Sequence, residues 1–244
     1  MSRRILILIS FAIIYCGCSK DDTSGDNETI SDTCKIKKIS GDVYELEFVY
    51  NQNKILQIKR TVGTTQTFDI IGISVDSTII NESGTSQLNP LVSMKYNDQR
   101  LVQLNYYYNS GTYNIYTFEY NSNRIRVKQD FYDGLLYNIR FADYYYNSSG
   151  NIINVKYYTI NDDNSSELTN DVTYSYDDHN NPWKNITFHT FFFYDLPEPR
   201  FFSNNNVLNV NSSLYTDQNE YSYNEDGYTA ECINREESYE YLCD

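Results

Sequence analysis

The chain has 244 residues, and its 33 Asp and Glu against 19 Lys and Arg give it a formal net charge of −14. So acidic a protein repels phosphate backbones, which excludes nucleic acid from its expected partners. No stretch shows a sustained helical period, so the sequence predicts little helix.

The first 17 residues have the layout of an export signal. Arg3 and Arg4 form a charged start, and residues 5–15 form an apolar core. That core is too short to span a bilayer, which needs about 20 apolar residues. Residues 1–17 are therefore predicted to be a signal peptide that is removed.

The signal ends in Tyr-Cys-Gly-Cys, with a small residue directly before Cys18. This pattern resembles the lipobox of bacterial lipoproteins, which implies cleavage before Cys18 and lipidation of its thiol. The alternative is an ordinary signal peptide cleaved nearby, with Cys18 incidental. A lipid anchor would supply about 0.8 kcal/mol per buried methylene. The next four residues resemble the Bacteroidetes signal for export to the outer surface of the outer membrane; they are Ser19, Lys20, Asp21 and Asp22.

Residues 18–33 are polar and acidic, which is typical of a flexible tether. Residues 34–244 then suit one large β domain better than two small ones. The sequence thus divides into a signal peptide at 1–17, a lipidated tether at 18–33 and a single β-repeat domain at 34–244.

Three cysteines follow the tether: Cys34, Cys232 and Cys243. An oxidising compartment favours one disulfide and leaves one thiol over. A bridge from Cys34 would join the two ends of the domain, whereas Cys232 and Cys243 could instead pair across a last hairpin. Zinc is the weaker interpretation, since only His179 and His189 could assist, and no metal site is predicted.

A short pattern recurs along the domain, consisting of an aromatic residue or Met, any residue, Tyr, and then Asn or Asp. Residues two apart in a strand point to the same face, so each copy sets two large side chains on one side. The Asn or Asp favours a turn. Each copy therefore predicts a strand that runs into a hairpin. The eight copies end at Asn51, Asn97, Asn109, Asn121, Asn147, Asp177, Asp195 and Asn224.

The predicted turns at Tyr96, Tyr108, Tyr120 and Tyr132 are twelve residues apart, which fits strands of about eight residues joined by tight turns. We expect a soluble, all-β antiparallel meander of repeated hairpins, curled or closed into a barrel-like single sheet that hides its edges. An outer-membrane barrel is disfavoured, because the strands alternate rings with polar residues such as Glu119.

The Tyr-Asn/Asp turns resemble degenerate YD repeats of Rhs-type shell proteins. Residues 174–186, 204–207 and 221–228 resemble, more closely, Bacteroidetes surface lipoproteins that carry a domain of unknown function with a porin-like fold. That likeness covers roughly residue 34 to the C-terminus. Residues 57–90 lack a clean copy of the pattern, so the sequence does not determine the strand register there. Families of this kind have no assigned activity, so the likeness implies a fold and an outer-membrane location but no catalytic residue.

Catalytic candidates are few. His179 falls in a predicted turn and His189 in an apolar run. Carboxylate pairs could cut glycosides, but all of them fall in predicted turns, where acids are common; the pairs are Asp162/Asp163, Asp177/Asp178 and Asp195/Glu198. Residues 162–167 offer oxygen ligands without the spacing of a calcium loop. No phosphate loop or nucleophile elbow appears, so neither an enzyme nor a cofactor is expected.

Binding is the better hypothesis. Trp183, the only tryptophan, is a candidate sugar contact, with the alternative that it covers the end of a hairpin. Ser77, in Asp-Ser-Thr, resembles a Bacteroidetes O-glycosylation acceptor, which would place it on an exposed loop. The favoured function is a surface-displayed, non-enzymatic binding or scaffold lipoprotein, held to the membrane by lipid and facing a glycan or a surface protein. The alternatives are an accessory glycan-binding lipoprotein of a polysaccharide uptake system and, more remotely, a glycoside hydrolase.

Overall fold

The computed structural model describes residues 34–51, 54–63, 65–73, 77–82, 92–97, 100–108, 111–185 and 196–243. Residues 31–244 form one compact unit. The predicted signal and tether lie outside the described residues, and with them Cys18, Ser19, Lys20, Asp21 and Asp22.

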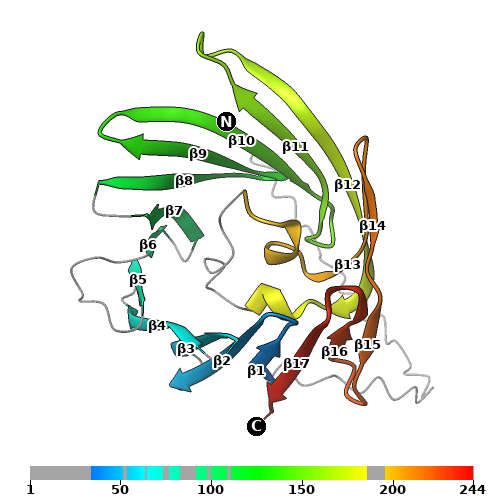
Figure 1. The fold of residues 1–244 in the computed structure, drawn as a ribbon. Helices are drawn as coiled ribbons and strands as arrows, with labels where there is room; N and C mark the ends of the chain where they lie inside the picture. The colour runs from blue at the N-terminus through cyan, green and yellow to red at the C-terminus, as the bar shows by residue number, and fades with distance from the viewer. Residues whose placement is uncertain are drawn as a thin grey trace, which may run out of the picture. The chain divides into compact units, whose positions relative to one another are not determined.

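Strands dominate the described chain (Figure 1). The first nine are β1 (Lys35–Ser40), β2 (Tyr44–Asn51), β3 (Lys54–Val62), β4 (Thr65–Ile73), β5 (Ser77–Glu82), β6 (Val92–Asn97), β7 (Arg100–Tyr107), β8 (Thr112–Asn121) and β9 (Arg124–Asp133). The others are β10 (Leu136–Tyr146), β11 (Ile152–Ile160), β12 (Ser166–Asn180), β13 (Asn205–Ser212), β14 (Thr216–Gln218), β15 (Tyr221–Tyr223), β16 (Thr229–Cys232) and β17 (Glu237–Leu242). Helical structure among the described residues is confined to three short 3₁₀ turns, η1 (Pro182–Asn185), η3 (Pro199–Phe201) and η4 (Ile233–Arg235).

All of these strands belong to one antiparallel sheet in which sequence neighbours pair. The sheet curls until β1 lies between β2 and β17, so the first and last strands are hydrogen-bonded. β14 pairs with β13 and β15 with β16, and the curled sheet is not a closed barrel. The predicted all-β curled meander is confirmed, and β3, β4 and β5 now have a register in the stretch where it was open.

The two ends of the sheet differ in sequence. Strands β2, β6, β8 and β10 end on a copy of the Tyr-Asn/Asp pattern, and β12 carries one that ends three residues before its last residue, so these copies gather at one end, here called the repeat end. The chain enters β1 and leaves β17 at the same end. The opposite end, here called the far end, holds the hairpins β7–β8, β9–β10, β11–β12 and β13–β14.

The tyrosines of the repeat fasten each strand to the start of the one before it. Tyr50 donates its hydroxyl to the Ile36 carbonyl at 2.6 Å, and Tyr120 donates to Leu101 at 2.9 Å. In the same way, Tyr176 of β12 donates its hydroxyl to the Ile152 carbonyl at the start of β11, at 2.6 Å. Burial raises the pKa of Tyr50 and of Tyr120 to about 12. The repeat therefore supplies both inward-facing rings and hydrogen bonds at the repeat end.

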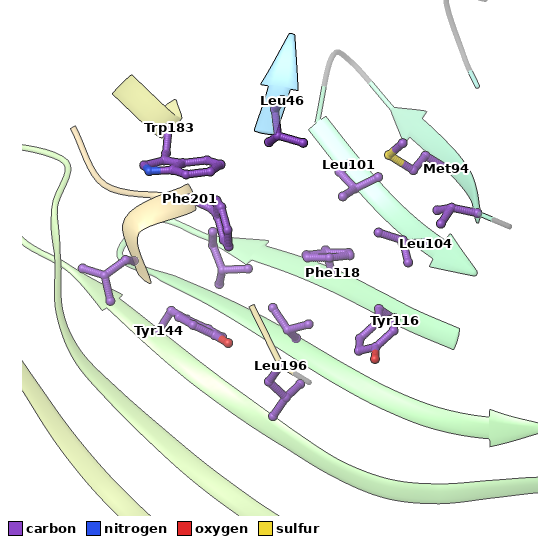
Figure 2. Close-up of a cluster of buried hydrophobic side chains, with 14 of the residues drawn as sticks. Leu46, Met94, Leu101, Leu104, Tyr116, Phe118, Tyr144, Trp183, Leu196 and Phe201 are labelled. Atoms are coloured by element: carbon purple, nitrogen blue, oxygen red, sulfur yellow. The ribbon is translucent and has the colours of Figure 1, made fainter. Parts of the chain in front are cut away.

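Strand alternation puts aliphatic and aromatic side chains on the inner face, where they form one core (Figure 2). The connection between β12 and β13 contributes to the same core, through Trp183 of η1, Leu196 and Phe201 of η3. The buried Tyr144 of β10 donates its hydroxyl to the Pro197 carbonyl at 2.8 Å. The described parts of this connection thus fill space enclosed by the sheet.

The outer face is polar and ion-paired. Lys38 lies 2.6 Å from Glu45, and Lys59 lies 3.4 Å from Glu47. On β9 and β10, Arg126 donates to both oxygens of the buried Asp143 at 2.8 Å. No helix of the described chain combines the length and the apolar character that crossing a membrane requires.

Candidate functional site

A recess of about 500 Å³ lies beside the repeat end, between the β10–β11 turn, the second half of β12 and the start of β13. Its lining is rich in amide, hydroxyl and carboxylate groups and contains no Lys or Arg; the members are Asn147, Ser149, Asn151, Ile153, Tyr174, Ser175, Tyr176, Asp177, Asp178 and Asn205. Ile153 is exposed there. Such a surface suits a neutral, hydroxyl-bearing ligand better than an anion.

Hydrogen bonds hold the rim of the recess in place. The buried Asn151 accepts the backbone N–H groups of Asn204 and Asn205 at 2.8 and 2.9 Å, and donates to the Asn205 side chain at 2.8 Å. Gly150 has a positive φ of 77°, and a Cβ there would lie 2.6 Å from the Asn204 amide nitrogen. Only glycine fits this turn without displacement, because any side chain meets both strain and a clash.

One corner of the recess is built around Asp177. Its carboxylate accepts the backbone N–H groups of His179 and Asn206, the Asn206 side-chain amide at 2.9 Å and the Tyr223 hydroxyl. The Tyr223 ring stacks on His179 with centroids 3.7 Å apart. Burial and then the Asp177 hydrogen bond raise the pKa of Tyr223. Asp177 thus acts as a structural acceptor whose oxygens are already occupied.

Two other predicted acids, Asp178 and Asp163, are exposed. Asp178 is almost fully exposed, and its Oδ1 lies 3.0 Å from Nδ1 of His179. Asp163 lies in an exposed turn, where one oxygen accepts both the backbone N–H and the hydroxyl of Ser165. No cluster of three or more His, Cys, Asp or Glu in the described chain could hold a metal ion. His189 and Asp195 lie outside the described residues.

Trp183 occupies the core, with 3% of its surface exposed. Its Nε1 donates to the Tyr239 hydroxyl at 3.2 Å, its ring meets Phe201 edge-on, and the Arg200 guanidinium lies 4.4 Å from the ring centroid. Figure 2 shows the indole packed beside Phe201. Trp183 is therefore not available as the candidate sugar contact, because its ring is buried by its own chain, which favours the alternative of a structural role.

Next to Trp183 lies a buried ion pair that the sequence analysis missed. Arg200 of η3 donates to the two oxygens of Glu237 at 3.0 and 3.1 Å. Glu237 also accepts the hydroxyls of Tyr44 at 3.0 Å and Tyr239 at 2.6 Å. Burial alone would raise the pKa of Glu237, but Arg200 and these donors outweigh it and hold that pKa below its usual value. These contacts join η3, in the β12–β13 connection, to strand β17 of the sheet.

Two remaining candidates are placed by the structure. Cys34 and Cys243 form the disulfide, and Cys232 is the buried free thiol, so the bridge joins the two ends of the domain. Ser77 is the first residue of β5 and pairs in register with Lys95 of β6. It lies at a strand terminus instead of the exposed loop that we expected, while its modification stays a prediction.

Comparisons with known proteins identify the fold but no family. No protein-family model matches the chain, and no curated protein matches it either. Among solved structures, the chain is similar to a porin-like protein from Bacteroides vulgatus ATCC 8482, with a TM-score of 0.56 and 12% identity. The similarity covers 86% of this chain and 99% of that one. The two proteins share a fold, which agrees with the porin-like architecture expected from the sequence.

Proposed function

We propose that the protein is a lipoprotein anchored through Cys18 to the outer membrane, facing outside the cell, where it acts as a non-enzymatic binding or scaffold module. The observation that carries this proposal is the direction of its strand alternation. A membrane-spanning sheet presents an apolar band outward. Here the aliphatic core lies on the inner face, and the ion pairs of Lys38, Lys59 and Arg126 lie on the outer face. Such a sheet needs another means of attachment, which a lipidated Cys18 would supply.

Binding is favoured over catalysis by the state of the candidate acids and bases. A general base needs a free lone pair within reach of the proton that it removes. Asp177 already accepts four hydrogen bonds, and the His179 ring is stacked on Tyr223. The recess, by contrast, is preformed and lined with groups that bind hydroxyls. This lining supports the second candidate, an accessory glycan-binding lipoprotein.

The anchor is tested in cells that naturally make the protein, fed with an alkyne-tagged palmitate. We expect the wild-type chain to be labelled and to partition with membranes, and the Cys18→Ala chain to lose both properties. Replacing Lys20, Asp21 and Asp22 with Ala should keep the label but remove sensitivity to protease added outside intact cells. Label retained in Cys18→Ala would contradict the proposed anchor.

The glycan candidate is tested with purified protein on an array of neutral oligosaccharides. Ser175→Trp places a large ring in the recess, and Thr173→Trp is the matched control, because it lies two residues away on the same exposed face of β12 but outside the lining. We expect a glycan signal that falls at least tenfold in Ser175→Trp and is retained in Thr173→Trp. No binding by the wild type, or equal loss in both variants, would remove this candidate. Hydrolysis of an arrayed glycan would contradict the non-enzymatic role.

A further inference from the structure

A bulge in strand β11 turns one aliphatic side chain into the recess beside the repeat end. The residues of β11 that pair with consecutive residues of β10 skip from Ile152 to Asn154, so Ile153 is the extra residue of the bulge. Ile152 is buried, whereas Ile153 is 41% exposed and lines the recess. Bulges re-aim side chains and are over-represented next to active sites. Ile153 is therefore an apolar contact set among the polar groups of the lining.

Strand β12, which pairs with β11, is irregular on the other side of the recess. Its register with β13 shifts between Tyr176 and Asn180, so residues 177–179 lie in a second, longer bulge. Asp178 in this bulge lines the recess and is almost fully exposed. Its Oδ1 lies 3.0 Å from Nδ1 of His179, and Oδ2 can accept a hydrogen bond from a ligand. The two bulges thus bring an aliphatic group and an acceptor to one recess.

The β10–β11 turn and the outer face of β12 add hydrogen-bond donors. Asn147 uses its Oδ1 to accept the backbone N–H groups of Ser149 and Asn151, at 3.0 and 2.9 Å. These bonds fix the plane of the amide, so its N–H donors are oriented before a ligand binds. The Ser175 hydroxyl accepts the Asn209 amide at 2.8 Å, so its own proton can be donated to a ligand. Asn147 and Ser175 both line the recess.

This set of groups matches an acetamido group better than a hydroxyl group. An acetamido carbonyl accepts from an amide or hydroxyl donor, its N–H donates to a carboxylate, and its methyl group packs against an aliphatic side chain. A sugar with only hydroxyl groups would leave Ile153 without an apolar contact from the ligand. The described lining contains acids and no Lys or Arg, which disfavours carboxylated and sulfated sugars. Its volume of about 500 Å³ is in the range of small-ligand sites.

We propose that the recess binds an uncharged, N-acetylated sugar, with the acetamido methyl group against Ile153 and the acetamido amide bonded by Asn147 and Asp178. The inference rests on the glycan-binding candidate and deepens it, by naming the class of sugar and the residue that selects it. Burying one methyl group of a ligand strengthens binding about fourfold. The recess should therefore prefer an acetamido sugar to its hydroxyl counterpart by at least that factor.

The test uses purified protein on an array of matched glycan pairs, in which one member carries an N-acetylhexosamine and the other the hexose of the same linkage. The pairs cover gluco, galacto and manno rings, and 6-deoxyhexoses are included as sugars whose methyl group is not part of an amide. We expect an acetamido member to bind at least fourfold more tightly than its partner in titration calorimetry. Equal binding within every pair, or a preference for hydroxyl or 6-deoxy members, would overturn the inference and leave the glycan candidate standing. No glycan binding at all would overturn both.

Two exposed aliphatic residues supply matched variants. Ile153→Ser removes the apolar contact in the recess, and Leu168→Ser removes one near the start of β12, outside the lining. We expect Ile153→Ser to reduce the acetamido preference below twofold while its affinity for the hydroxyl member stays within twofold of wild type, which also shows that the recess is folded. Leu168→Ser should keep the preference. An unchanged preference in Ile153→Ser, or equal loss in both variants, would overturn the inference.

The amide contact is tested separately by Asn147→Asp. Aspartate keeps the oxygen that holds the turn and removes the amide N–H donors. We expect acetamido members to bind at least threefold more weakly, with thermal unfolding unchanged. Acetamido binding equal to wild type would contradict the assigned role of Asn147.

Discussion

Replacing Glu237 with Gln removes the negative charge that compensates Arg200 inside the sheet. Arg200 would keep one acidic neighbour, Glu198, 3.2 Å from its Nε and half exposed. Stranding one partner of a buried ion pair costs about 3–5 kcal/mol. We expect the lower end of that range, because Glu198 offsets part of the charge. The loss should appear in urea unfolding as a lower midpoint with an unchanged slope.

Two comparisons separate this cost from a general loss of packing. Glu47→Gln breaks the exposed ion pair with Lys59, and we expect it to change stability by less than about 1 kcal/mol. The double variant Arg200→Met/Glu237→Leu removes both buried charges and should recover much of the loss, since apolar replacement of a whole pair is often neutral. A loss below about 1 kcal/mol in Glu237→Gln would refute the proposed role of the pair.

The Arg200–Glu237 ion pair also predicts that the stability of the fold depends on pH. The pKa of Glu237 lies below its usual value in the folded protein. A depressed carboxyl pKa contributes stability above the unfolded value of about 4.3, and this contribution is lost as pH falls through the folded value. The stability difference between wild type and Glu237→Gln should therefore be largest near neutrality and shrink below pH ~4. A difference that stays constant from pH 7 to pH 3 would contradict the assignment.

Three further outcomes are expected. Burial raises the pKa values of Tyr50 and Tyr120 to about 12. Their contribution to stability should therefore be full below pH ~10 and be lost as the pH rises from ~10 to ~12. Urea titrations should show a smaller loss of stability over this pH range in Tyr50→Phe than in the wild type. Trp183→Ala should cost about 3–5 kcal/mol, and the wild-type emission should be blue-shifted and shielded from iodide until unfolding; a solvent-quenched signal would contradict its burial. Cys34→Ala should cost about 2–5 kcal/mol, because the bridge to Cys243 closes almost the whole domain; thermal unfolding with and without reductant checks this, and unchanged stability would refute it.

The local architecture was predictable because its causes are local. The period of two along a strand and the turn preference of Asn or Asp act within a few residues, so they located hairpins at Asn97 and Asn121. The structure shows that most described copies lie at one end of the sheet, which we did not predict. Turns twelve residues apart fall at alternate ends of an antiparallel sheet, which places Tyr96 and Tyr120 at the repeat end and Tyr108 at the far end.

The candidate site was less predictable, because burial depends on contacts distant in sequence. Trp183 follows a proline in a polar stretch, which favours an exposed turn, yet its indole packs against Tyr239, 56 residues later. Arg200 and Glu237 are 37 residues apart and meet only because the sheet curls. The Asn-rich run at 204–206 was the one signal of the recess, since side-chain amides in such a run hydrogen-bond neighbouring turns, as the Asn204 amide does by donating to the Ser149 carbonyl.

The central claim is that Cys18 attaches this polar-faced sheet to a membrane. Intact-mass spectrometry of the protein purified from its native membranes tests it directly, combined with sequencing of the N-terminal peptide. The account predicts a mature chain that begins at Cys18 and carries a diacylglyceryl group on that thiol. An unmodified Cys18, or a chain that begins at another residue, would contradict it.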